Sequence, residues 1–148
     1  MEDVLNVAAY ISQRYYSEYG EQIDKMKLHE IMYFAQRESI IQTGEPLFDA
    51  TFYGWKYGPV LKEILDTTLI SIEPKDFISN CFPILNKVFE SYAGKESWSL
   101  SRLTQGELSW KNSRLLENAD NLMSLEDIHK DAERIKTGRE KLNRLGLL

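Results

Sequence analysis

Hydrophobic residues recur at helical spacing at the start of the chain. The first such series comprises Val4, Val7, Ala8, Ile11 and Tyr15. Its intervals of three and four residues predict a helix over about 3–19. Gly20 is suited to end this helix, and Asp24 to cap the next one by accepting a backbone N–H, so a second helix is predicted to run to about Thr43. The middle of the second helix is apolar over more than one stripe, which indicates a central helix with neighbours on several sides.

The pattern changes from helical spacing to alternation after Gly44. Between 48 and 57, Phe48, Ala50 and Phe52 fall on one side of an extended chain. Tyr53, Trp55 and Tyr57 fall on the other, so this segment is predicted to be a short strand or ordered loop. Gly58-Pro59 is predicted to begin a further helix, because proline at the first helical position loses only an N–H that has no partner there.

Three more helices are predicted in the second half. Pro83 is suited to open one of them, and a short helix follows from Trp98 to a turn at Gly106, with Trp98 and Trp110 as anchors. Ser124, three residues before Asp127, is suited to cap the last helix. The sequence therefore predicts a mainly α fold: a single compact helical domain, 1–148, of about six helices with a short extended or β segment near residues 48–57.

Charge is distributed unevenly along the chain. The formal net charge is −5, but the segment from His129 to Leu148 has six basic and three acidic residues. Its local charge of +3 leaves −8 for the rest, which disfavours binding to a phosphate backbone. The basic residues predict either a solvated helix face or a contact with phosphate or an acidic partner, and the interspersed acids favour the first.

The sequence also predicts a cytoplasmic protein without a membrane segment. The single cysteine, Cys81, lies in an apolar context typical of a buried thiol in a reducing compartment. The N-terminus has no basic flank or apolar stretch of a secretory leader, and no segment approaches the ~20 apolar residues that span a bilayer.

Catalytic motifs are incomplete. His29-Glu30 begins like a zinc-protease helix, but Tyr33 stands where the second histidine ligand belongs. Only two histidines are present, and neither Cys81 nor a serine lies in a known nucleophile motif. Bulky residues between Gly54 and Gly58 would keep a phosphate from the backbone. The predictions are no enzyme activity, no metal site and no cofactor.

The aromatic residues over 48–57 have three interpretations. They could form core, contact a partner protein, or stack on nucleic-acid bases with the help of Lys56. Burial statistics favour core first, and the acidic charge places nucleic acid last. If a partner is bound, the predicted contact residues are Tyr53, Trp55, Lys56 and Tyr57.

Several blocks of sequence, taken in order, resemble a known family. They are Lys27–Gln36, Gly44–Phe48, Phe52–Val60, Ser97-Trp98, Leu100–Thr104 and Trp110-Lys111. These blocks resemble Panacea domains, the phage-associated SocA-like antitoxins. The motif residues predicted to be structural are Lys27, Leu28, Tyr33, Phe34, Phe48, Gly58, Pro59 and Trp110. The chain departs from the family at Gln105, where a histidine is usual, and at Ser109, where a proline is common.

The resemblance implies an antitoxin that binds a cognate toxin and neutralises it. One family member is similar in role to an adaptor that delivers its toxin to a Clp-type protease, so such a protease is a further expected partner. Two alternatives stay open at this stage. A DNA-binding transcriptional regulator of phage origin would use the basic C-terminal helix, and an enzyme would use a site assembled around His29 and Glu30.

Overall fold

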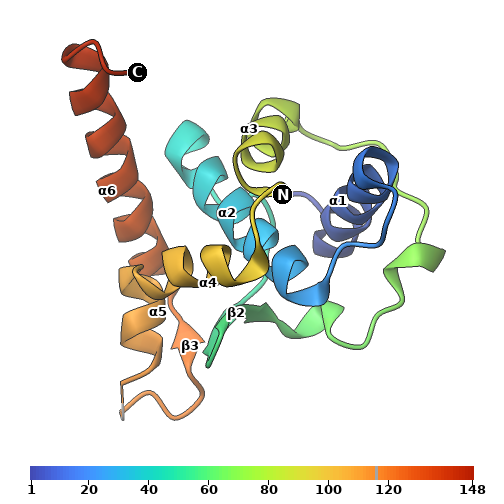
Figure 1. Cartoon of the computed structure of the whole chain (residues 1–148). Helices are drawn as coiled ribbons and strands as arrows, with labels where there is room; N and C mark the ends of the chain where they lie inside the picture. The colour runs from blue at the N-terminus through green and yellow to red at the C-terminus, as the bar shows by residue number, and fades with distance from the viewer. Residues whose placement is uncertain (116) are drawn as a thin grey trace.

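The computed structural model describes residues 1–115 and 117–148 (Figure 1). In these residues the α-helices are α1 (Val4–Tyr19), α2 (Lys25–Thr43), α3 (Phe82–Tyr92), α4 (Ser97–Gln105), α5 (Leu108–Ser113) and α6 (Leu125–Arg144). The strands are β1 (Phe52–Trp55), β2 (Gly58–Leu61) and β3 (Leu122–Met123), and the short 3-10 helices are η1 (Lys62–Ile64) and η2 (Leu69–Ser71). The predicted mainly α fold with a short β segment is confirmed.

The helix ends follow the capping residues. Asp3 accepts a hydrogen bond from the Asn6 N–H at the start of α1, and Asp24 accepts one from the Met26 N–H at the start of α2. Ser124 does the same for the Asp127 N–H at the start of α6. Gly20 and Gly44 adopt the left-handed conformation that ends α1 and α2. The predicted boundaries of these helices are therefore confirmed.

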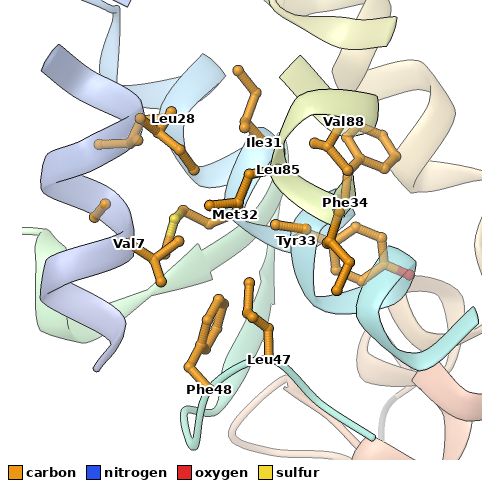
Figure 2. Packing of buried hydrophobic residues seen from close by; sticks show 14 of the residues in the cluster. Val7, Leu28, Ile31, Met32, Tyr33, Phe34, Leu47, Phe48, Leu85 and Val88 are labelled. Carbon is orange, nitrogen blue, oxygen red and sulfur yellow. The ribbon is translucent and has the colours of Figure 1, made fainter. Parts of the chain in front are cut away.

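Helix α2 is the centre of the packing. It runs through the middle of the molecule with α1, α3, α4 and α6 around it, and every residue from Lys27 to Ile40 is buried (Figure 1). Its apolar side chains meet Val7 of α1 and Leu85 and Val88 of α3, with Phe48 below them (Figure 2). A helix with neighbours on several sides needs apolar residues on several faces and not in one stripe, which explains the broad apolar density of its sequence.

The strands form a small antiparallel sheet in the order β2-β1-β3. Trp55 pairs with Gly58, so Lys56 and Tyr57 form the turn of a β1–β2 hairpin. The prediction that Gly58-Pro59 begins a helix is wrong, because both residues lie in β2. Pro59 is tolerated there because β2 is an edge strand, where a missing N–H does not interrupt the ladder. Gly58 has φ of 144°, outside the helical region.

The buried residues of helix α6 all lie in its first half. Ile128, Asp131 and Ala132 are buried, whereas the side chains after Ala132 are mostly exposed. In Figure 1 the C-terminal turns of α6 project beyond the other helices. Across the described residues, none of the helices has the length and apolarity needed to cross a membrane.

Candidate partner-binding site

The β1–β2 turn is fixed to the helices through its backbone. The Trp110 ring N–H donates to the Trp55 carbonyl at 3.0 Å, and Arg114 donates to the Gly54 carbonyl at 2.9 Å. The Gln105 amide, which replaces the usual family histidine, lies 3.4 Å from the Lys56 carbonyl. Helices α4 and α5 therefore hold the turn in place while its side chains stay outside the core.

The predicted contact residues do not all lie together. Trp55 and Tyr57 are 42% and 59% exposed, and Lys56 is also exposed, with its ammonium 5.4 Å from the centre of the Tyr57 ring. These three residues are called the turn surface below. Tyr53 is half-buried further along β1, with the Lys62 ammonium 4.0 Å from its ring centre. Partner binding at these residues stays a prediction.

The family-motif residues lie in or against the core. Leu28, Tyr33, Phe34 and Phe48 are buried with Pro59, and Trp110 is half-buried. Lys27 is also buried, and its ammonium donates to the Ala93 carbonyl at 2.9 Å. That bond joins the start of α2 to the end of α3. These contacts support a structural role for the motif.

Two buried ionisable residues of α2 support the hairpin from beneath. His29 accepts a hydrogen bond at Nδ1 from the Leu61 N–H at 3.0 Å, and burial together with Lys25 lowers its pKa to about 4. Glu30 is 1% exposed, and burial raises its pKa to about 8 despite the hydrogen bond that it accepts from Ser101. A histidine that is buried and used as an acceptor for β2 in this way does not support the enzyme alternative.

Gly58 lies against one of these two residues, Glu30. A Cβ added at Gly58 would overlap Glu30 Oε1, and its φ of 144° is a conformation that side chains with a Cβ rarely adopt. We therefore expect Gly58→Ala to lower the free energy of unfolding by about 2 kcal/mol. Urea unfolding would measure this, with Gly138→Ala in exposed α6 as control, because an added Cβ there meets no atom within 4 Å. Equal stability of the two variants would contradict the assigned contact.

An ionic network built on the buried carboxylates of Glu107 and Glu38 attaches α6, and no sequence pattern predicted it. Glu107, 2% exposed, accepts from Arg37 and, at 2.7 Å, from Arg134 of α6. Glu38 accepts two hydrogen bonds from Arg139, at 2.8 and 2.9 Å. Two basic residues of α6, Arg134 and Arg139, therefore form ion pairs within the chain. This weakens the interpretation of α6 as a fully solvated helix face, and also the interpretation of α6 as a phosphate-binding helix.

Asp131 of α6 completes this attachment. Its carboxylate accepts from the Leu108 and Ser109 N–H groups at 2.8 and 2.9 Å, at the first turn of α5. The proline common in the family at position 109 could not donate that N–H. Ser109 also lies 3.1 Å from the Tyr33 hydroxyl, whose pKa is raised by burial and by the nearby Glu107 and Asp131. Having serine and not the common family proline at position 109 therefore provides an N–H that bonds to Asp131 of α6.

Trp98 was predicted to anchor its segment, but its side chain is 61% exposed on α4 and packs little against the core. The side of α4 that faces α2 is occupied by Leu100, Ser101 and Thr104 instead, all buried. Trp98 is offset from that side, so its ring lies over solvent. The hydrophobic residue type suggested burial, whereas position on the helix decides it.

These features define a mainly α domain that presents an exposed aromatic turn held by α4 and α5, with an ionic network around Glu107 that attaches α6. A family model described as "Antitoxin SocA-like, Panacea domain" matches residues 26–111, more than half of the chain. The chain belongs to this family. The matched segment runs from the start of α2 through most of α5, so it includes the turn surface but not α1 or α6. Comparisons with curated proteins and with solved structures gave no match.

Proposed function

We propose that this chain is an antitoxin that neutralises a cognate toxin by direct binding, and that the turn surface makes the central contact. The observation that carries this proposal is the position of two exposed aromatic side chains, Trp55 and Tyr57, within the segment that matches the antitoxin family. Exposed aromatic residues on a rigid support are the usual source of binding free energy in protein interfaces, because little conformational entropy is lost when they are covered.

The two alternatives from the sequence gain less support. A DNA-binding regulator would need the basic residues of α6 free for phosphates, but Arg134 and Arg139 are engaged by Glu107 and Glu38. An enzyme would need an accessible His29, which is buried as an acceptor for β2. The direct-binding antitoxin is therefore the function that we adopt.

The test is growth of bacteria in which the protein encoded next to this chain is induced as the toxin, with and without this antitoxin. We expect arrest to be relieved by the wild type, and a stable complex to co-purify. Tyr57→Ala should weaken that complex about 10–100-fold, because loss of a central aromatic contact typically costs about 1.4–2.7 kcal/mol.

Tyr16→Ala is the matched control. Tyr16 is 58% exposed, nearly as much as Tyr57, but lies on α1 outside the matched segment. Its replacement should leave the affinity within about twofold. If both variants bind the toxin as the wild type does, the turn surface is not the contact. If the wild type itself neither relieves arrest nor co-purifies, the proposal of direct neutralisation fails.

Delivery to a Clp-type protease is a separable part of the proposal. If the chain is an adaptor, the half-life of the toxin in cells should shorten when the antitoxin is present, and this shortening should disappear in a strain that lacks the protease. If direct binding suffices, the half-life is the same in both strains while growth is still relieved. Pulse-chase measurement of the toxin distinguishes these outcomes.

A further inference from the structure

One side of α4 continues the turn surface. Trp98, Arg102 and Gln105 are four and then three residues apart, so they lie on one side of the helix, which we call the α4 flank. Gln105 contacts the Lys56 carbonyl of the turn, so one end of the flank meets the turn surface directly. In Figure 1, α4 crosses the front of the molecule beside β2.

The first turn of α2 also contacts α4. Ser101 donates a hydrogen bond to Glu30 at 3.1 Å and lies 3.3 Å from the sulfur of Met26. Ser97 at the start of α4 bonds to Asp24, the capping residue of α2. Met26 is 36% exposed and Lys25 is exposed next to it. The turn surface and the start of α2 therefore both contact α4, the first through Gln105 and the second through Ser97 and Ser101.

This combined surface is basic although the protein is acidic. Lys25, Lys56 and Arg102 are all exposed, and within the described residues none of them forms an ion pair. The carboxylate of Asp24 is engaged by the Met26 N–H and by Ser97, and the exposed Glu96 has Lys95 as its neighbour. Among the described residues, this surface thus has three cations without an ion-pair partner: Lys56 beside the Tyr57 ring, Arg102 one turn from Trp98 on α4, and Lys25 at the start of α2. The formal charge of the whole chain is −5.

We propose that this surface binds an acidic segment of a partner protein, with Tyr57 and Trp98 covering its apolar side chains and Lys56, Arg102 and Lys25 meeting its carboxylates. Complementary charge around a few aromatic contacts favours encounter and fixes orientation. A polypeptide fits better than nucleic acid, because the charge of the rest of the chain repels a long polyanion while a short acidic segment meets only the basic surface. The inference rests on the proposed function in taking the toxin as the source of that segment.

The experiment measures binding of a fluorescently labelled copolymer of glutamate and tyrosine to the full chain by anisotropy. We expect Lys56→Glu/Arg102→Glu to weaken binding about tenfold, and added salt to weaken binding of the wild type. The control is Lys141→Glu/Arg144→Glu, which makes the same charge change on the exposed end of α6 and should bind within about twofold of the wild type. Equal weakening in both variants would overturn the surface, since net charge alone would then explain the binding.

Two further measurements test the acidic-segment surface independently of the toxin. In the wild type, the amide NMR signals of residues 25–26, 56–57 and 98–105 should shift when the copolymer is added. If only signals of other residues shift, the proposal is overturned, regardless of the affinities of the variants. A single-stranded DNA of equal length should bind more weakly, and tighter binding would assign the surface to nucleic acid. If the copolymer binds as expected but growth arrest is not relieved, the antitoxin function fails while the acidic-segment surface stands.

Discussion

Replacing Glu107 by alanine is expected to lower the free energy of unfolding by about 3–5 kcal/mol, because removal of one member of a buried ion pair leaves the other charge without compensation. The charge left behind is that of Arg37, whose side chain is 7% exposed. Its guanidinium keeps the Tyr92 hydroxyl at 3.1 Å, but no buried carboxylate would remain bonded to it. The pKa of Arg37 is raised by Glu107 against the effect of burial, so Arg37 stays charged in the fold.

Urea unfolding at neutral pH measures this loss. Glu126→Ala is the control, because Glu126 is 82% exposed in a pair with Lys130 and should change the free energy by less than about 0.5 kcal/mol. A double variant, Arg37→Leu with Glu107→Leu, should lose less than the sum of its single changes, since it removes both charges together. A loss at Glu107→Ala as small as that of the control would show that the network does not stabilise the attachment of α6.

Local signals explain why most helices could be predicted. Asp24 and Gly44 mark the two ends of α2 through short-range hydrogen bonding and backbone conformation, which depend on neighbours in sequence. The Gly58-Pro59 pair shows the limit of such signals. Proline is compatible both with a first helical turn and with an edge strand, and pairing of β2 with β1 decides between them.

The candidate site was only partly predictable for the same reason. Trp55 and Tyr57 follow from alternation along one extended segment, whereas the α4 flank joins them through Gln105, far along the chain. The network at Glu107 needs Arg37 and Arg134, which are distant in sequence. Each of them, considered alone, looks like an ordinary surface charge. Contacts of this kind are set by how the helices pack, so no short pattern reveals them.

Stability is expected to decline from about pH 6.5 to 8 because of Glu30. Its pKa is raised from 4.5 to about 8 in the fold, chiefly by burial, so the folded chain keeps a proton in this interval that the unfolded chain has released. The free energy of unfolding then falls with pH by roughly 1.4 kcal/mol per unit. His29 acts in the opposite direction: its pKa falls from 6.5 to about 4, so stability is lost as pH drops through that range. The two effects offset each other between about pH 4.5 and 6.5.

Glu30→Gln removes the titration while keeping an oxygen that accepts from Ser101. We expect the wild type to lose about 2 kcal/mol between pH 6.5 and 8, and the variant to lose little over the same range. Below pH 6.5 the variant should weaken progressively, since the His29 effect is no longer offset. Urea unfolding across pH measures both, with Glu96→Gln as an exposed control on α4 that should follow the wild type. A variant that declines above pH 6.5 as steeply as the wild type would mean that Glu30 is already ionised in the fold.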